Sequence, residues 1–254
     1  MRYLRQSVLP GWGAGGQARL TRSRVLLVGL GGLGSIASLY LAAAGIGTLV
    51  INDFDTVDET NLHRQLLYGE RDVGQSKTEV ARTRLLALNS GIRVEALPQR
   101  LTAPELEDEV RRADLVLDTT DHYPTRYDIN RLCVRHRRRL VGGSCIGYGG
   151  QLLAFDFRQV SAPCYACLYP EEMAEDPMRC GTNGVSGPVT GVLGSLAAQA
   201  VLDLLIDRDS PWPGFLWRWD ARTGGLRAGR LSRDPACPVC RTVGSRARVE
   251  GSRA

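Results

Sequence analysis

The sequence predicts an α/β fold with a largely parallel sheet flanked by helices, and three observations support this prediction. Residues 24–30 form an apolar, β-branched run typical of a buried strand, followed by a glycine-rich turn and an apolar helical pattern over 34–44. The next apolar strand, 48–54, completes a βαβ unit of about 30 residues. The length of 254 residues suits one large domain of this Rossmann-like type.

Strands and helices continue to alternate up to residue 143. Helical spacing covers Lys77–Leu88, and Thr102 with Glu105 three residues later forms a capping box that opens another helix. We also expect strands over 94–97, 115–119 and 140–143 and a helix over 126–138. Strands joined in this way pair in parallel through right-handed crossovers, and helices cover the sheet.

The pattern changes after residue 143, where a C-terminal antiparallel extension is expected. Its elements are a strand over 151–157, an aperiodic stretch over 162–188, an apolar helix over 189–205, and a hairpin formed by 215–219 and 226–231. The first 23 residues form a polar, glycine-rich lead-in, and residues 242–254 have the composition of a disordered tail.

Composition places the chain among ordinary globular proteins, since 43% of its residues are hydrophobic and 23% are charged. The net charge of +5 is too small to demand a polyanion, and the arginines at 135 and 137–139 lie at a helix end that favours cations anyway, so no nucleic-acid partner is expected. Residues 25–51 carry no charge, but glycines interrupt the run, so no membrane partner is expected. Without a signal-peptide pattern, we expect a cytoplasmic protein.

The turn between the first strand and helix is the first candidate binding site. It carries Gly29, Gly31, Gly32 and Gly34 in the context where a nucleotide approaches a helix N-terminus. Asp53 follows at the end of the second strand, where a carboxylate can accept hydrogen bonds from ribose hydroxyls. These residues predict nucleotide binding but leave a dinucleotide and ATP both open, and the plain alternative is a tight turn with a capping aspartate.

Polar residues further along the chain favour a triphosphate. Asn61, Arg64 and Gln65 have the spacing of one helical face, and Lys77, which is the only lysine, begins a helix. Arginine suits bidentate phosphate contacts, and lysine suits a point charge on phosphate oxygens. Asp121 follows a strand at the carboxyl edge of the sheet and suits a Mg²⁺ ligand. Each residue alone could be a solvated surface charge.

Seven cysteines in a chain without export signals are typical of metal ligands or reactive thiols. Two C-x-x-C pairs, Cys164 with Cys167 and Cys237 with Cys240, match a closed four-cysteine zinc site with a structural role. Cys180 is either a chemically active thiol or an unreactive loop residue. Cys133 and Cys145 lie in apolar contexts typical of core residues.

At this point the chain resembles the ThiF/MoeB (HesA) adenylyltransferases, which are relatives of the ubiquitin-activating enzymes. The resemblance extends from Arg2 to Cys240. Its motifs are Arg2-Tyr-Leu-Arg5-Gln6, the glycine turn, Asp53-Phe-Asp55, Asn61 to Gln65, Lys77, Thr120-Asp121, Gly149-Gly150-Gln151, Cys180 before Gly184-Val-Ser-Gly187-Pro188, and both cysteine pairs.

The resemblance implies an activity and a set of site residues. The activity is adenylation of the C-terminal glycine of a ubiquitin-like sulfur carrier protein, with ATP, Mg²⁺ and a structural Zn²⁺ as cofactors. The implied roles are Asp53 on the ribose, Asn61, Arg64 and Lys77 on the phosphates, Asp121 on magnesium, with Asp55 and Gln65 in the same nucleotide-binding set and Cys180 as a sulfur acceptor. Arg5 would reach the triphosphate of a neighbouring subunit, which implies a homodimer.

The resemblance also implies one adenylation domain over 1–241, with a nucleotide-binding half up to about 143 and a carrier-binding and zinc half from 144. A separate sulfurtransferase or cysteine desulfurase is a possible sulfur source.

The chain departs from the family at His122, where an asparagine is usual, so His122 is either a tolerated neighbour or a change to the metal site. Two alternatives to the adenylation activity are an NAD-dependent oxidoreductase and a catalytically silent carrier-binding subunit.

Overall fold

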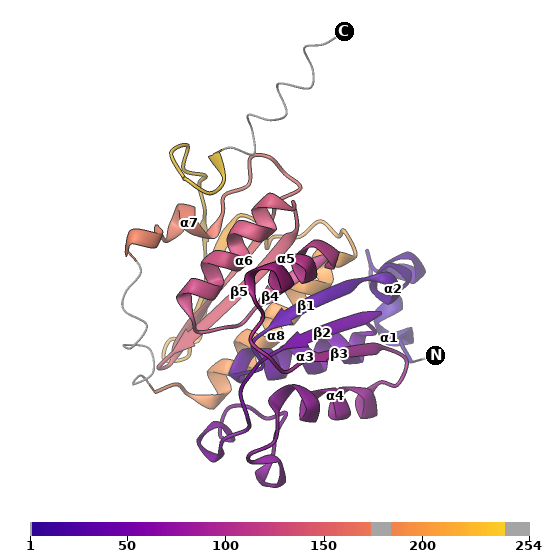
Figure 1. The fold of residues 1–254 in the computed structure, drawn as a ribbon. Helices are drawn as coiled ribbons and strands as arrows, with labels where there is room; N and C mark the ends of the chain where they lie inside the picture. Colours follow the sequence, from indigo (N-terminus) through magenta and orange to yellow (C-terminus); the bar gives the residue numbers. More distant parts are fainter. Residues whose placement is uncertain (1, 174–183, 242–254) are drawn as a thin grey trace.

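A computed structural model describes residues 2–173 and 184–241, and its centre is one eight-stranded sheet (Figure 1). The parallel strands are β1 (Arg24–Val28), β2 (Thr48–Asn52), β3 (Arg93–Leu97), β4 (Leu115–Asp118) and β5 (Arg139–Ile146), and the antiparallel ones are β6 (Gly149–Asp156), β7 (Phe215–Asp220) and β8 (Gly225–Arg230). The order across the sheet is β3-β2-β1-β4-β5-β6-β7-β8. The predicted fold class, parallel first and antiparallel after residue 143, is confirmed.

Helices cover both faces of this sheet. They are α1 (Leu4–Ser7), α2 (Gly13–Arg22), α3 (Gly32–Ala44), α4 (Lys77–Leu88), α5 (Ala103–Arg112), α6 (Tyr123–Arg135), α7 (Tyr165–Leu168) and α8 (Gly187–Leu205), with 3-10 turns at Glu59–Asn61, Glu70–Asp72 and Glu171–Met173. Helices α3, α4 and α8 lie on one face and α5 and α6 on the other (Figure 1).

Alternation along β1 shows how the sequence builds these two layers. Val25 and Leu27 point into the core under α3 and α8, whereas Leu26 and Val28 point into the core under α5 and α6. All four side chains are almost fully buried. The first part of the uncharged run 25–51 is therefore a central strand buried on both faces, as the sequence predicted.

Two segments differ from the sequence-based expectation. The N-terminal lead-in folds into α1 and α2, because Trp12 and Leu20 insert into the core and this packing outweighs the low helix propensity of three glycines in α2. The aperiodic stretch over 162–188 contains α7, a single turn that begins directly after Cys164 and includes Cys167. Residues 242–254, expected to be a tail, lie outside the described residues.

Helix α8 is long and apolar enough to cross a membrane, and it is the one such helix in the described part of the chain. The position of α8 in the fold gives another reason for its apolar sequence. In the fold, 67% of its apolar window is buried, and its residues pack against α3 and the sheet. The helix is therefore apolar because it is a core helix of this layer.

The glycine turn between β1 and α3 positions the cleft described below. Gly29 has a φ of +91°, a left-handed conformation that glycine adopts without strain. Gly34 packs so closely that a Cβ there would lie 2.0 Å from the carbonyl oxygen of Gly29 and 2.7 Å from Oγ1 of Thr119. This close approach holds the start of α3 directly over the ends of β1 and β4.

Replacing Gly34 with alanine should therefore destabilise the fold. The added methyl group must push α3 away from the turn, and we expect the free energy of unfolding to fall by about 1 to 3 kcal/mol, the usual cost of overpacking. Urea unfolding measures this change. Gly15→Ala is the matched control, because nothing lies within 4 Å of a Cβ at that position of α2 and alanine favours the helix. Equal stability of the two variants would contradict the packing argument.

Candidate functional site

A large cleft opens where the carboxyl ends of the parallel strands meet the antiparallel strands. Its volume is about 2110 Å³, well above the roughly 300–1,000 Å³ of a typical small-molecule site. One end is lined by the glycine turn and the ends of β2 and β4, and the other by β6, β7 and β8. Ligands of open α/β sheets bind at this edge, so the cleft has room for a nucleotide and a second reactant.

The cleft gathers most of the predicted site residues. Those that line it are Gly29, Gly31, Gly32, Asp53, Asp55, Asn61, Arg64, Gln65, Lys77 and Asp121. Gly34 lies beneath the turn and packs instead of lining the cleft. Arg5 is exposed on α1 and does not line the cleft of its own chain. Cys180 lies outside the described residues.

Asp53 ties the end of β2 to the glycine turn. One carboxylate oxygen accepts a hydrogen bond from the N–H of Leu30 at 2.7 Å, and the other accepts from the N–H of Asp55 at 2.9 Å. Burial raises the pKa of the Asp53 carboxyl above its usual value, although the Lys77 charge and these N–H groups act in the opposite direction. The carboxylate retains lone pairs for a ribose hydroxyl, so its position supports the predicted role.

Lys77 is buried and held by an ion pair. Its Nζ lies 2.9 Å from the Asp55 carboxylate, and its backbone N–H donates to the carbonyl of the same residue. The side chain of Lys77 is only 6% exposed, whereas that of Asp55 is 55% exposed. Asp55 therefore positions the lysine at the N-terminal end of α4, where its charge faces the cleft.

Residues 61–65 form a tight turn, although Asn61, Arg64 and Gln65 have the spacing of one helical face. The N–H groups of Arg64 and Gln65 both donate to the carbonyl of Asn61 at 3.0 Å, which brings the three side chains to one side as the spacing suggested. Gln65 is buried beside Gly31, and its Oε1 has no hydrogen-bond partner among the described residues. An orphaned buried acceptor next to a glycine turn fits a bound ligand that donates hydrogen bonds.

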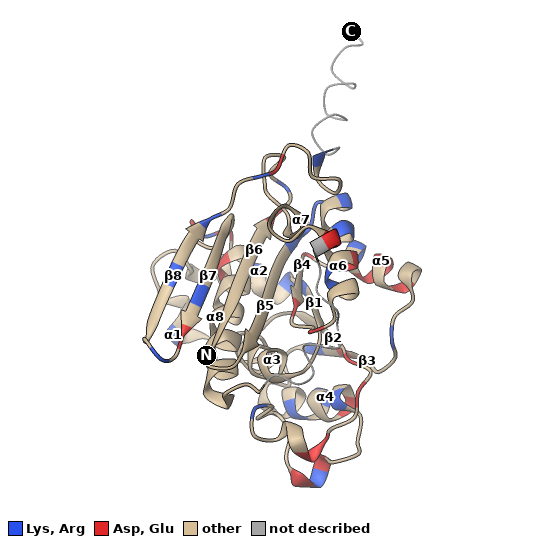
Figure 2. Ribbon diagram, turned by 90° about the vertical axis from the view of Figure 1, so that its left-hand side faces the viewer, with Lys and Arg blue, Asp and Glu red and all other residues tan. Residues whose placement is uncertain are grey.

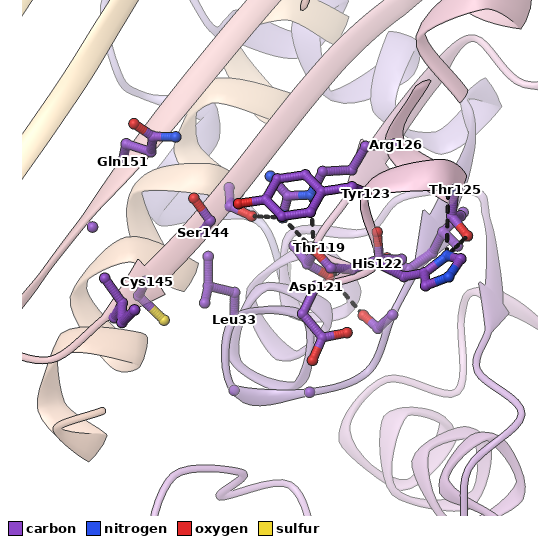
Figure 3. Close-up of a pocket in the computed structure, with 18 of the residues that line it drawn as sticks. Leu33, Thr119, Asp121, His122, Tyr123, Thr125, Arg126, Ser144, Cys145 and Gln151 are labelled. Atoms are coloured by element: carbon purple, nitrogen blue, oxygen red, sulfur yellow. Dashed lines mark hydrogen bonds between the residues drawn. The ribbon is translucent and has the colours of Figure 1, made fainter. Parts of the chain in front are cut away.

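The loop after β4 carries Asp121 and His122 (Figure 3). Asp121 is exposed, and its carboxylate has no hydrogen bond or ion pair within the described part of the chain, so its oxygens are free to ligate a cation. The ring of His122 caps α6 by accepting from the N–H of Thr125 at 3.4 Å. Asparagine also serves well as an N-cap, so the capping contact agrees with a tolerated substitution and leaves a change to the metal site as a prediction.

Arg126 is a cleft residue that sequence reasoning missed. Its guanidinium is buried, and it donates to the carbonyl of Thr120 and, at 2.8 Å, to that of Gly143 (Figure 3). The side chain thereby fastens the Asp121 loop to β5. Its position in the first turn of α6 is unfavourable for a cation by the helix dipole, and that conflict was a signal available in the sequence.

Of the two thiols expected in the core, only Cys133 is fully buried. Cys145 is partly exposed and lines the cleft, which corrects the expectation. Burial nevertheless raises the pKa of the Cys145 thiol to about 11, so it is protonated near neutral pH. Cys145 therefore lacks the depressed pKa of an activated nucleophile.

The two C-x-x-C pairs meet as predicted. The ligand atoms of Cys164, Cys167, Cys237 and Cys240 all lie within 4.8 Å of one another. Three sulfur–sulfur distances are 3.9, 3.7 and 3.5 Å, close to the roughly 3.8 Å that tetrahedral zinc with Zn–S bonds of about 2.3 Å requires. Four thiolates leave no open position, so the residues fit a structural Zn²⁺ that joins α7 to the C-terminal segment.

The fold and the cleft together define a class of α/β protein with a glycine turn suited to a nucleotide, a cleft with room for a second reactant, and four clustered cysteines that fit zinc. The model of the ThiF family matches residues 3–239, so the chain belongs to the ThiF family. The resemblance stated from the sequence motifs is thus confirmed.

The relatives of the chain are enzymes of this family. It is 44% identical over 240 residues to the sulfur carrier protein ThiS adenylyltransferase of Escherichia coli, covering 94% of each chain. It is 41% identical over 240 residues to the molybdopterin-synthase adenylyltransferase of the same organism, covering 94% of this chain and 96% of the relative. Among solved structures, E. coli MccB with ATP superposes with a TM-score of 0.82 at 25% identity, covering 94% of this chain and 73% of MccB.

Zinc loading can be tested through the cysteine cluster. We expect about one zinc per chain by elemental mass spectrometry, and we expect Cys237→Ser to lose the metal and to lower the melting temperature by roughly 10 °C or more, because structural zinc binding is coupled to folding. Cys145→Ser is the matched control and should keep its zinc. If the wild-type protein contains no zinc, and Cys237→Ser melts at the wild-type temperature, the assignment of a structural zinc site is wrong.

Proposed function

We propose that this chain uses ATP to adenylate the C-terminal glycine of a ubiquitin-like sulfur carrier protein. The observation that carries the proposal is the single cleft in which the glycine turn, the orphaned Gln65 acceptor and the Lys77 charge lie at one end and an open sheet face lies at the other. Two relatives named as adenylyltransferases, one of them acting on the carrier ThiS, support it.

The proposed reaction joins the carrier to AMP. A carboxylate oxygen of the terminal glycine attacks the α-phosphorus and forms a new O–P bond, while the bond from the α-phosphorus to the oxygen that bridges it to the β-phosphorus breaks, with its electron pair leaving on pyrophosphate. The carboxylate is already ionised near pH 7, so no residue need remove a proton. Catalysis then rests on holding the reactants in line and neutralising phosphate charge.

Each cleft residue has a proposed part in that task. Asp53 holds the ribose, and Asn61, Arg64 and Lys77 hold the phosphates, with Asp55 positioning the lysine. The Oε1 of Gln65, unpaired among the described residues, accepts a hydrogen bond from a donor group of the nucleotide. Asp121 would hold Mg²⁺, which when bound neutralises charge on the phosphate oxygens. Arg126 keeps the Asp121 loop against β5.

We extend the proposal to the assembly and to later steps. Arg5 lies on α1, away from its own cleft, and it would enter the cleft of a second copy in a homodimer. The Cys180 thiolate would either attack the activated glycine, forming a thioester as AMP leaves, or take the outer sulfur of a donor persulfide as the donor leaves as a thiolate. A separate sulfurtransferase or cysteine desulfurase would be the sulfur source. The cytoplasm, where the carriers would be made, is the proposed compartment.

Pyrophosphate exchange tests the central step. With ATP, Mg²⁺ and ThiS, the wild-type chain should incorporate labelled pyrophosphate into ATP, and Lys77→Gln should lower the rate by about 100-fold or more because a charge on the phosphates is lost. Arg82→Gln is the matched control on the outer side of α4 and should keep the wild-type rate. If no Gly-Gly-ended carrier supports exchange, the proposal is wrong, and NAD binding by such a chain would favour an oxidoreductase.

Subunit complementation tests the role of Arg5. Arg5→Ala and Lys77→Gln should each be nearly inactive as homodimers, because every site lacks one cation. A mixed dimer purified through two tags should regain about half of the wild-type exchange rate, since one of its two clefts combines an intact Lys77 with the intact Arg5 of the other chain. An inactive mixed dimer would place Arg5 in its own cleft or outside the reaction.

A further inference from the structure

A polar row crosses the antiparallel half of the sheet. Ser144 on β5 pairs with Gln151 on β6, which pairs with Arg218 on β7, which pairs with Arg227 on β8. All four residues line the cleft. Because neighbouring strands lie about 4.8 Å apart, the row extends about 14 Å from Ser144 on β5 to Arg227 on β8 at the outer edge of the sheet (Figure 2).

The outer end of this row holds two like charges directly opposite each other. Arg218 and Arg227 are cross-strand partners, an arrangement that destabilises a sheet. Among the described residues neither has a salt bridge. The nearby carboxylate of Asp220 is paired with Arg222 at 3.0 Å, and this pairing lowers the Asp220 pKa more than the charge of Arg227 does. The pair is thus an uncompensated positive charge on the wall of the cleft.

The position of the pair argues against the nucleotide as its counter-ion. The glycine turn and Lys77 lie at the opposite end of the cleft, beyond β4 and β5. Two exposed apolar side chains line the same cleft. They are Ile146, which is 53% exposed, and Tyr148, which is 62% exposed. Apolar side chains beside unpaired arginines are typical of a protein interface and unlike a site for a free anion.

We propose that Arg218 and Arg227 form the docking surface for an acidic patch on the carrier protein, next to its C-terminal tail. This rests on the proposed function, which requires the tail to reach the nucleotide. The distance of about 14 Å between Ser144 and Arg227 corresponds to about four residues of extended chain. The partner therefore presents a carboxylate about four residues or more before its terminal glycine, where it neutralises the arginine pair.

Charge reversal tests the docking surface. We expect the double variant Arg218→Glu with Arg227→Glu to raise the KM for ThiS in pyrophosphate exchange at least tenfold, with the KM for ATP within twofold of wild type. Raising salt should weaken ThiS binding to the wild type more than to the double variant. The single variant Arg227→Glu, which places opposite charges across the strands, should melt at or above the wild-type temperature while binding ThiS less tightly.

Arg230→Glu is the matched control. It makes the same charge change on the same strand, but Arg230 pairs with Phe215 three positions from Arg227, on the other face, and does not line the cleft. Its KM for ThiS should stay within twofold of wild type. An equal effect of Arg230→Glu, or a parallel rise in the KM for ATP, would overturn the proposal, because either would show a general charge effect or a phosphate site.

Direct calorimetry separates this proposal from the proposed function. If the wild type shows no exchange but binds ThiS in a way that the double reversal weakens, adenylation fails and the docking surface stands. If exchange occurs and the reversal changes neither KM nor binding, the docking surface fails and adenylation stands. If neither ThiS nor any other Gly-Gly-ended carrier binds, the docking proposal is wrong.

Discussion

The cleft depends on the hydrogen bonds that the buried Asp53 carboxylate accepts from the backbone of Leu30 and Asp55. They connect the ends of β1 and β2 at the point where the glycine turn exposes the first N–H groups of α3. The turn can approach a ligand because Gly29 accepts a left-handed conformation and Gly34 leaves room for the helix. Burying a carboxylate is unfavourable in itself, and two N–H donors and the nearby Lys77 charge offset that cost.

Charges at the cleft fall into two groups that differ in how they are held. Near the nucleotide end, the cations are fixed by buried contacts, as in the pairing of Lys77 with Asp55 and the bonds of Arg126 to two carbonyls. At the outer end, Arg218 and Arg227 face each other without a carboxylate of their own among the described residues. The first arrangement suits a ligand whose phosphates need a rigid frame, and the second suits a partner that brings its own negative charge.

Much of this arrangement could be predicted because its signals are local. The βαβ pattern, the glycine turn and the two C-x-x-C pairs each depend on short spacing, and the structure has all of them. Helix α2 was missed because its stability comes from Trp12 and Leu20 packing into a distant core, which propensity cannot show. The pairing of Arg218 with Arg227 was missed because strand register cannot be seen in one sequence. For Arg126, the unfavourable position near a helix N-terminus was visible in the sequence, but the carbonyls of Thr120 and Gly143 that hold it are tertiary contacts that were not. The roles assigned to individual cleft residues remain predictions.

The strand order has a consequence for how the chain folds. The central strand β1 pairs with β2 and with β4, whose residues follow it by about 24 and 90 positions, so one edge of β1 has no partner until much of the chain has been synthesised. Contacts of such long sequence separation slow folding and leave apolar strands exposed in the meantime. The complete cleft takes residues from Val28 to Arg227, so it exists only after both the parallel and the antiparallel strands have been synthesised and paired.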